Sequence, residues 1–429
     1  MFMIDRRKFI AGVGATTSTM LAAPHVARAA GARVVVVGGG PAGATAAKYL
    51  RRADPSIEVT LIEANKDYYT CFMSNEVLSG ERTLDSLKFG YAGLAKAGVE
   101  VVHDLVVGID GAAKVVTTQG GQKFPYDRCI VAPGIDFAWG ALPGYTAEAA
   151  EKIPHAWKAG PQTALLRKQL EAMPDGGVFV MVAPPNPYRC PPGPYERASQ
   201  VAQYFKHHKP KSKIIILDTK DGFSKQKLFE QAWAKFYGFG TDKSLIEWVP
   251  ASKGGKPTAL DVAGMAVQTE FDTVKAAVIN VIPAQKAGKI AFDAGLTEGN
   301  WAPVNKATFE SKKIPGIHVL GDGSDAATMP KSGYAANSQG KVTAAAVAAM
   351  LSGKAAPTPA YVNTCYSIAG ENHAFSVAGV YTYDAEKNAI AEVQGSGGLS
   401  PIDASDEDRK REVLYAQSWF RNITADIWG

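Results

Sequence analysis

Short apolar runs alternate with amphipathic stretches along the chain, and twice they predict a strand, a helix and a second strand in succession. The predicted elements of these two sets lie at 33–37, 44–51 and 58–63, and at 177–183, 196–206 and 213–218. Strands that alternate with helices in this way are typical of parallel βαβ units. The pattern therefore predicts an α/β protein that contains two such units.

The first turn carries glycines at the spacing Gly-x-Gly-x-x-Gly, at Gly38, Gly40 and Gly43. Between a strand and a helix, such glycines let the backbone approach a pyrophosphate at the helix N-terminus. Glu63 follows 20 residues after Gly43, at the end of the next strand, where it is expected to accept hydrogen bonds from a ribose. This context favours a dinucleotide site over a glycine-rich turn without a ligand.

The second turn has a different composition. Residues 183–194 contain six prolines, which have no backbone N–H group to offer a phosphate. Two βαβ units predict a flavoprotein with FAD on the first unit, but nicotinamide binding on the second is not expected. Electrons must then arrive and leave by another route.

A later strand, expected over 317–320, ends in Gly321-Asp322. This is the usual second fingerprint of FAD enzymes, in which the aspartate bonds to the ribityl chain; an ordinary surface turn is the alternative. Lys331 precedes a helix expected over 335–351, whose N-terminus would stabilise an anionic reduced flavin. Lys331 either adds to that positive charge or is a surface lysine.

The remaining pattern predicts shorter elements and a linker. These are strands at 99–102, 129–132 and 278–282, a hairpin from 114–118 and 122–126, helices at 161–173 and 406–421, and a linker at 353–359.

Length and charge exclude several classes of protein. A chain of 429 residues exceeds one ordinary core, so two or three domains are expected. The net charge is +5, but residues 1–29 carry four basic residues and one acidic residue, so their removal leaves +2. Such a nearly neutral chain is not expected to bind nucleic acid or an anionic membrane surface.

The N-terminus has the features of a twin-arginine signal peptide over 1–29. Arg6 and Arg7 precede the short apolar stretch 9–23, and Ala27-Arg28-Ala29 provides a small-x-small cleavage site. A membrane anchor is the alternative, but fifteen residues that include two glycines are too short to span a bilayer. We therefore expect export to the periplasm as a folded, cofactor-loaded protein without membrane insertion.

The four cysteines form no Cys-x-x-Cys pair, so neither a zinc site nor a c-type haem on this chain is expected. Cys190 and Cys365 both lie in loop-like sequence. In an exported protein they can pair, either as a two-electron relay beside a flavin or as a structural disulfide. For Cys71 and Cys129 the default expectation is a buried structural cysteine.

Four motifs together resemble the flavoprotein subunits of flavocytochrome c sulfide dehydrogenases. They lie at 67–71, 189–197, 330–334 and 363–366. The resemblance implies a glutathione-reductase-like fold with an α+β C-terminal domain. It divides the mature chain into FAD-binding parts 30–143 and 285–355, a nucleotide-like domain without NAD at 144–284, and a flavin and partner interface domain at 356–429.

The same resemblance implies roles for individual residues. Cys71 carries FAD through an 8α-S-cysteinyl link, and Cys190 with Cys365 forms the redox disulfide. Hydrosulfide attacks Cys190, Cys365 is the flavin-side sulfur, and Glu196 is either a proton carrier or an ordinary first-turn glutamate. Because this chain has no haem motif, the electrons are expected to pass singly to a separate c-type cytochrome subunit in a heterodimer.

Three other functions compete with sulfide oxidation through a cytochrome. A sulfide:quinone reductase would need an apolar surface, whereas residues 406–411 form a charged run. An FAD electron-transfer subunit would lack its own substrate site, and a disulfide reductase would use NADH. Trp419, Phe420 and Trp428 are expected in the core, at a partner surface or against the flavin.

Overall fold

A five-stranded parallel sheet carries the glycine-rich turn. The computed structural model describes residues 31–429, so the expected signal peptide at 1–29 lies outside the described residues. In spatial order the strands are β20 (Ile317–Val319), β9 (Arg128–Val131), β1 (Arg33–Val37), β2 (Glu58–Ile62) and β5 (Glu100–Val102). The valine and isoleucine side chains of β20, β9, β1 and β2 are almost fully buried, as in a parallel sheet covered on both faces.

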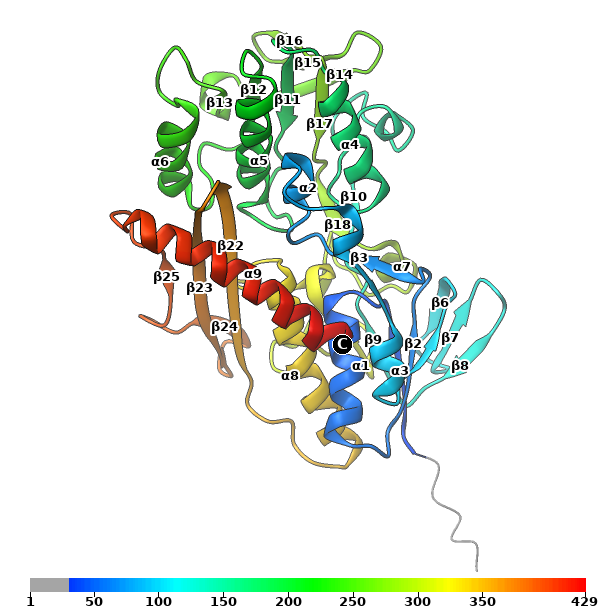
Figure 1. The fold of residues 1–429 in the computed structure, drawn as a ribbon. Coiled ribbons are helices and arrows are strands. Elements are labelled where there is room, and N and C mark those ends of the chain that lie inside the picture. Colours follow the sequence, from blue (N-terminus) through cyan, green and yellow to red (C-terminus); the bar gives the residue numbers. More distant parts are fainter. Residues whose placement is uncertain (1–30) are drawn as a thin grey trace, which may run out of the picture. The chain divides into compact units, whose positions relative to one another are not determined.

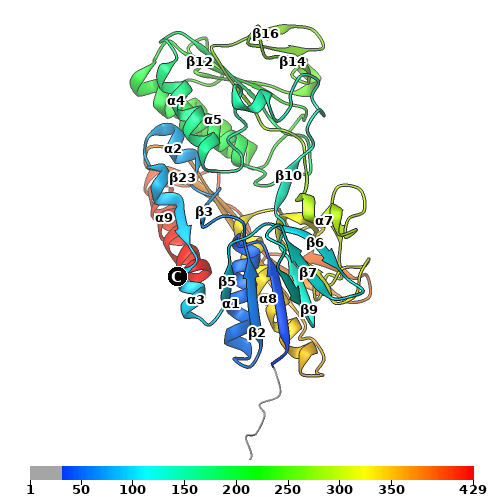
Figure 2. The same ribbon diagram turned by 90° about the vertical axis from the view of Figure 1, so that its right-hand side faces the viewer.

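Two helices pack together against one face of this sheet. They are α1 (Pro41–Ala53) and α8 (Gly333–Leu351), and they lie side by side in both ribbon views (Figures 1 and 2). Alanine and glycine dominate their contact, which lets the backbones approach closely; Gly340, for example, lies against Thr45. The expected helix over 335–351 is confirmed, and it starts two residues earlier.

A second parallel sheet repeats the βαβ arrangement. Its strand order is β13 (Ile246–Val249), β12 (Lys213–Leu217), β11 (Val178–Val182) and β17 (Val278–Val281). Its helices are α4 (Pro161–Ala172), α5 (Gly193–His208) and α6 (Gln226–Tyr237). The prediction of two βαβ units in an α/β fold is therefore confirmed.

Antiparallel ribbons and short elements complete these two layers. The expected hairpin pairs β7 (Val115–Thr118) with β8 (Lys123–Pro125), next to β6 (Val106–Asp110). β10 (Ile135–Phe137) pairs with β18 (Gln285–Ala287) at the two chain crossings between the sheets. The other elements are β3 (Asp67–Tyr69), α2 (Asn75–Ser79), β4 (Lys88–Gly90), α3 (Ala92–Lys96), β14 (Pro257–Asp261), β15 (Ala266–Thr269), β16 (Thr273–Lys275), α7 (Lys289–Asp293), β19 (Ala302–Pro303) and β21 (Ser324–Asp325).

The C-terminal region is a long hairpin crossed by a helix. β22 (Ala360–Gly370) pairs antiparallel with β23 (His373–Asp384), which also pairs with β24 (Ala389–Glu392) and β25 (Gly398–Leu399). After β25 the chain enters α9 (Asp406–Trp428), which packs across β23 and β22 and ends beside α1 (Figure 1). The expected helix over 406–421 is confirmed but continues for seven more residues.

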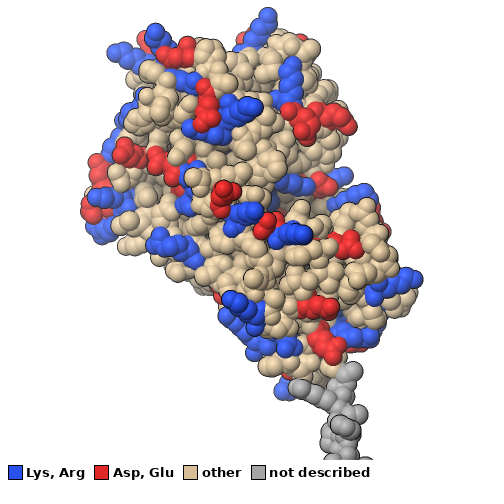
Figure 3. Space-filling view, turned by 45° about the vertical axis from the view of Figure 1, so that its right-hand side comes forward, with Lys and Arg blue, Asp and Glu red and all other residues tan. Residues whose placement is uncertain are grey.

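No helix within residues 31–429 is both long enough and apolar enough to cross a bilayer. Basic and acidic side chains are interspersed on the face drawn in Figure 3, with no large area of one sign.

Candidate active site

The glycine-rich turn joins β1 to α1, and its shape requires glycine at two positions. Gly38 has a φ of +95°, and a Cβ atom there would overlap the carbonyl oxygen of Ala132. A Cβ atom on Gly43 would overlap the carbonyl oxygen of Gly38. Gly40 is the N-cap of α1, where its backbone faces open space beside the Tyr68 ring. The turn thus presents a bare helix N-terminus.

Glu63, directly after β2, braces this turn. Its Oε2 atom accepts a hydrogen bond from the Gly39 N–H at 2.8 Å, and Oε1 accepts one from the Asn65 N–H at 2.9 Å. The carboxylate also lines the adjoining cavity. Each carboxylate oxygen accepts more than one bond, so a contact with a ligand hydroxyl remains open to it.

A cavity of about 800 Å³ extends along the carboxyl ends of the first sheet. Of the residues expected to bind the cofactor, five line it and two do not. Those that line it are Gly38, Gly40, Glu63, Cys71 and Asp322. Gly43 lies inside the turn, where it permits close packing, and Lys331 lies behind Asp322.

Asp322 follows β20 in the turn Gly321–Gly323. Its Oδ1 atom is buried without a hydrogen-bond partner, and Oδ2 lies 3.9 Å from Nη1 of Arg189. Burial raises the pKa of this carboxyl group, while Arg189 and Lys331 oppose the rise. An unpaired buried acceptor at the cavity wall fits a ligand that donates from a hydroxyl group.

Lys331 is half-buried, and its ammonium group already has hydrogen-bond partners. The alternative of a surface lysine is therefore wrong. Its ammonium group donates to the carbonyl oxygens of Asp322 at 2.8 Å and Ser324 at 2.7 Å, and it lies 3.7 Å from the Trp301 ring centroid. Burial lowers the pKa of Lys331 to about 8. Its own carbonyl oxygen accepts the N–H of Cys190 at 2.8 Å, which ties the Asp322 turn to the Cys190 turn.

Cys190 lies in the proline-rich turn between β11 and α5, as expected. It has a φ of +60°, and its carbonyl oxygen accepts the Gly193 N–H at 2.8 Å. A Cβ atom on Gly193 would lie 2.9 Å from the Cys190 sulfur and 2.7 Å from the Trp157 ring. Glycine at 193 is therefore needed for the thiol to sit where it does.

Cys365 lies in the middle of β22, so the expectation of loop-like sequence is wrong for this residue. Residues 361–368 are rich in β-branched and aromatic side chains, which favour a strand. β22 brings Cys365 against Cys190, and their side chains form a hydrogen bond. All four cysteines are thiols here, so the expected Cys190–Cys365 disulfide is not formed in this structure, although the contact it requires is present.

The two thiols differ in acidity. The hydrogen bond from Cys190 and the nearby Lys225 ammonium lower the pKa of Cys365, against the effects of burial and Glu196. The same hydrogen bond and burial raise the pKa of Cys190. Cys365 is therefore the thiolate member of the pair.

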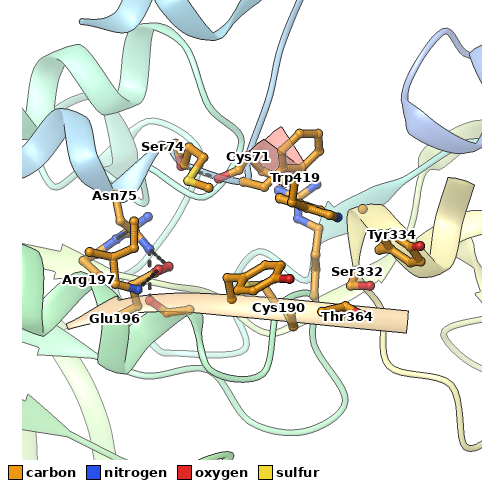
Figure 4. Close-up of a pocket in the computed structure, with 18 of the residues that line it drawn as sticks. Cys71, Ser74, Asn75, Cys190, Glu196, Arg197, Ser332, Tyr334, Thr364 and Trp419 are labelled. Atoms are coloured by element: carbon orange, nitrogen blue, oxygen red, sulfur yellow. Dashed lines mark hydrogen bonds between the residues drawn. The ribbon is translucent and has the colours of Figure 1, made fainter. Parts of the chain in front are cut away.

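A second cavity, of about 60 Å³, surrounds this pair (Figure 4). Its polar lining includes Glu196, Arg189 and Arg197, and its aromatic lining is Phe72, Trp157, Tyr334, Tyr366 and Trp419. Cys71 and Arg189 line both cavities, so these two residues lie between them. This half-buried position of Cys71 differs from the buried structural cysteine of the default expectation, which Cys129 on β9 does meet.

Glu196 lies in the first turn of α5, and both of its carboxylate oxygens accept hydrogen bonds. The donors are Asn75 Nδ2 and the Ile368 N–H, each at 2.9 Å. Burial raises the pKa of Glu196, while these two bonds and Lys225 oppose the rise. A carboxyl group with a raised pKa beside the thiols is suited to carrying a proton.

Arg197 lies beneath the site and is 2% exposed. Its guanidinium group donates to Asn75 Oδ1, to Asn280 Oδ1 and to the carbonyl oxygens of His155 and Ala156. It thereby fixes α2 and α5 relative to β17. Sequence reasoning assigned no role to four residues of this region: Asn75, Arg189, Arg197 and Lys225. Only the two arginines carried a signal, because they flank Cys190 within a recognised motif.

The three aromatic residues of α9 have different surroundings. Trp428 is buried, stacks on Phe89 with ring centroids 5.3 Å apart, and donates its indole N–H to the Gly39 carbonyl oxygen at 3.2 Å. Phe420 is buried in the core. Trp419 lines the smaller cavity, with the Phe72 ring 5.4 Å away.

Three family models match this chain. Residues 163–283 match the central part of the sulfide dehydrogenase [flavocytochrome c] flavoprotein chain, and residues 357–428 match the flavin-binding part of flavocytochrome c sulphide dehydrogenase. Residues 32–167 match pyridine nucleotide-disulphide oxidoreductase.

Individual proteins resemble the chain over shorter or more divergent stretches. The sulfide dehydrogenase [flavocytochrome c] flavoprotein chain of Chlorobaculum thiosulfatiphilum is 62% identical over 45 residues, which are 94% of that sequence and 10% of this one. Mouse mitochondrial sulfide:quinone oxidoreductase is 23% identical over 310 residues, 67% of this chain but less than two thirds (65%) of the mouse protein. The solved sulfide:quinone oxidoreductase of Aquifex aeolicus superposes with a TM-score of 0.68 at 18% identity, over 92% of each chain, and shares the fold.

Proposed function

This chain belongs to the family of flavocytochrome c sulfide dehydrogenase flavoprotein chains, and we propose that it oxidises hydrosulfide at Cys190 and Cys365 with FAD as its cofactor. The observation that carries this proposal is the contact between the two thiols, 175 residues apart in sequence, in a small cavity. Cys71 lines both this cavity and the larger one.

The residues around the larger cavity fit FAD. The glycine turn would take the pyrophosphate, Glu63 the ribose, and the unpaired Oδ1 of Asp322 a ribityl hydroxyl group. The Cys71 thiol, between the two cavities, would hold the flavin through an 8α-S-cysteinyl bond. When bound, FAD accepts two electrons from the sulfur centre and releases them one at a time to a c-type cytochrome.

The thiol acidities indicate which sulfur hydrosulfide attacks in the oxidised enzyme. Attack on the Cys190 sulfur forms an S–S bond to the incoming sulfur, breaks the bond to Cys365, and leaves the electron pair on the Cys365 sulfur. The more acidic thiol leaves faster, and Cys365 has the lowered pKa. We therefore assign Cys190 as the attacked sulfur, which becomes a persulfide.

In this proposal Glu196 accepts and then releases the proton of the incoming sulfur. Burial raises its pKa, which favours the protonated form and suits this carboxyl group to take up and pass on a proton. The two N–H donors hold its carboxylate in one orientation.

Two features of the sequence support the proposed partner and compartment. The chain has no Cys-x-x-Cys-His motif, so a separate c-type cytochrome subunit would supply the haem. The twin-arginine pattern at 1–29 supports export to the periplasm.

Anaerobic titration with sulfide tests the reaction. Cys190→Ser and Cys365→Ser should each slow sulfide-dependent flavin bleaching by at least about 10³-fold, because each removes one half of the disulfide. Cys129→Ser, on the buried strand β9, is the matched control and should bleach at the wild-type rate. Undiminished bleaching in either active-site variant would disprove the mechanism.

The electron acceptor separates a sulfide:quinone reductase from a cytochrome-linked enzyme. Oxidised cytochrome c should reoxidise the reduced protein, whereas a water-soluble quinone should do so at least about tenfold more slowly. Peptide mapping of the denatured protein should find flavin on the Cys71 peptide, and its absence from Cys71→Ala would identify the link.

A further inference from the structure

Lys225 is a buried lysine whose ammonium group is anchored on the strand that carries Cys365. It precedes α6 in a left-handed conformation with a φ of +63°, and only 4% of it is exposed. Its Nζ atom donates to the carbonyl oxygen of Cys365 at 2.6 Å and to the hydroxyl of Ser367 at 3.0 Å. Both acceptors are neutral.

Burial of this ammonium group costs folding free energy unless its positive charge interacts favourably with neighbouring groups. Burial of an ammonium group without a counter-charge is unfavourable, and burial lowers the pKa of Lys225. The half-buried Lys220 pairs with Asp218 at 2.6 Å, but Lys225 forms no ion pair with a carboxylate among residues 31–429. The anionic groups that face it are Cys365, Glu196, Cys190 and, on α9, Glu412.

We propose that Lys225 is a positioning residue that keeps Cys365 as the thiolate of the pair, so that hydrosulfide is directed to Cys190. This inference rests on the proposed sulfide oxidation and adds the residue that decides the direction of attack. The hydrogen bond to the Cys365 carbonyl oxygen anchors the ammonium group on the strand that bears this cysteine.

The charge, rather than the hydrogen bonds, carries the effect. A neutral donor could satisfy the Cys365 carbonyl oxygen and Ser367 equally well, but it would supply no positive charge to stabilise the nearby thiolate. The groups that act on Cys365 are Cys190 and Lys225, which favour the thiolate, and Glu196, which opposes it. Removal of the ammonium group therefore leaves only Cys190 to favour the thiolate against Glu196 and burial, and it disfavours ionisation of Cys365.

Alkylation of the reduced holoprotein at a series of pH values tests this role without sulfide. Iodoacetamide modifies the thiolate, and peptide mapping reports Cys365 separately from Cys190. In Lys225→Met the pH midpoint for Cys365 should rise by about 1 unit, so that about tenfold less thiolate is present at neutral pH. Lys225→Gln, which keeps a donor for both acceptors, should show the same shift, and Lys225→Arg should keep the wild-type midpoint.

Lys220→Met is the matched control, because it removes a half-buried lysine of the same domain that does not face the thiols. In this variant the pH midpoint for alkylation of Cys365 should equal that of the wild type. An unchanged Cys365 midpoint in both Lys225→Met and Lys225→Gln would overturn the inference. If the wild-type protein did not bleach with sulfide although the midpoint shifted as expected, the proposed function would fail while this electrostatic role stood.

Discussion

The two βαβ units of this chain have the same topology but put their turns to opposite uses. In the first unit only residues 38–40 separate β1 from α1, and the turn leaves the helix N-terminus bare. In the second unit residues 183–192 separate β11 from α5. Six prolines between 183 and 194 remove donors, and the N–H groups of Arg189 and Cys190 bond within the protein, to Gln285 and Lys331.

The acidic residues at the ends of the second strands differ in the same way. Glu63 lines the large cavity. Asp218, in the equivalent position after β12, is fully buried and accepts bonds from Tyr195 at 2.5 Å, Trp248 at 3.1 Å and Lys220 at 2.6 Å. An acid whose oxygens are all bonded inside the protein cannot bind a ribose without breaking those bonds.

The difference shows how the turn of a βαβ unit can hold a cysteine thiol in place of a phosphate. The longer turn reaches the first domain, where the N–H of Cys190 bonds to the Lys331 carbonyl oxygen. Proline restricts the backbone on both sides of Cys190, so the thiol is held against β22 with little loss of entropy. The same prolines that remove phosphate binding thus fix the position of a reactive sulfur.

The largest effect is expected from a methyl group added inside the first turn. In Gly43→Ala the new Cβ atom would overlap the Gly38 carbonyl oxygen, which is backbone and cannot move aside. We expect a loss of about 3 kcal/mol in unfolding free energy and loss of flavin from the purified protein. Denaturant unfolding and flavin absorbance per chain measure both quantities.

Gly40→Ala is the control for this prediction. Its Cβ atom would lie 3.4 Å from the Tyr68 ring, at the edge of ordinary contact, so the fold should remain stable. Flavin content should nevertheless fall, since the added methyl group faces the cavity. Full flavin content in both variants would show that the turn does not hold a pyrophosphate.

A methyl group in the second turn should impair sulfide chemistry and leave flavin in place. Gly193→Ala would press on the Cys190 sulfur and on Trp157. Because a displacement of about 1 Å at a reacting atom can cost about 10²-fold in rate, sulfide-dependent bleaching should slow by about that factor. Stopped-flow absorbance measures the rate, with Gly108→Ala, where no atom lies within 4 Å of the added Cβ, as the control. Loss of flavin in Gly193→Ala would instead make this turn part of the cofactor site.

Local motifs made much of both turns predictable. β1 was expected over the residues where it is found, because a run of valines before a glycine turn specifies a buried parallel strand. The hairpin of β22 and β23 was missed, since polar residues interrupt its alternation, and with it the strand position of Cys365. α9 extends beyond its expected end because Lys48, on α1, donates to the carbonyl oxygens of Ala425 and Asp426.

The residues of the site likewise divide into those that short stretches of sequence specify and those whose partners only the fold brings near. Gly38 and Cys190 have a positive φ, and Gly43 packs against the nearby Gly38 carbonyl oxygen, so short stretches of sequence specify all three. Asn75 and Lys225 act only on partners more than 100 residues away, at Glu196 and Cys365. No short-range pattern marks such residues before the chain is folded.

Acidification should destabilise the two domains to a similar extent, through one buried histidine in each. Burial and nearby cations lower the pKa of His155 to about 3, and burial lowers that of His318 to about 4. The unfolded chain binds these protons first, so stability falls as the pH drops below about 6.5 and levels off near the folded values. Between pH 7 and 5 each histidine should account for about 2 kcal/mol.

His155→Asn should remove the part of this pH-dependent loss of stability that arises in the second domain. The substitution His207→Asn, at an exposed histidine, should leave the pH dependence unchanged. Denaturant unfolding at pH 7 and pH 5 measures the difference. An unchanged pH dependence in His155→Asn would show that His155 is not neutral in the folded protein.

The smallest effect, an absence of change, is expected from NADH, and it tests the comparison at its centre. NADH would have to place its pyrophosphate at a turn that lacks donors and its ribose at Asp218, which is already bonded to Tyr195, Trp248 and Lys220. Anaerobic addition of NADH to the holoprotein should therefore leave the flavin absorbance unchanged, while sulfide added afterwards to the same sample should bleach it. Asp218→Asn should not create a response, because the missing donors lie in the turn rather than at the acid. Bleaching by NADH alone would mean that the second unit still binds a dinucleotide in spite of its prolines, and the contrast between the two turns would then have no functional meaning.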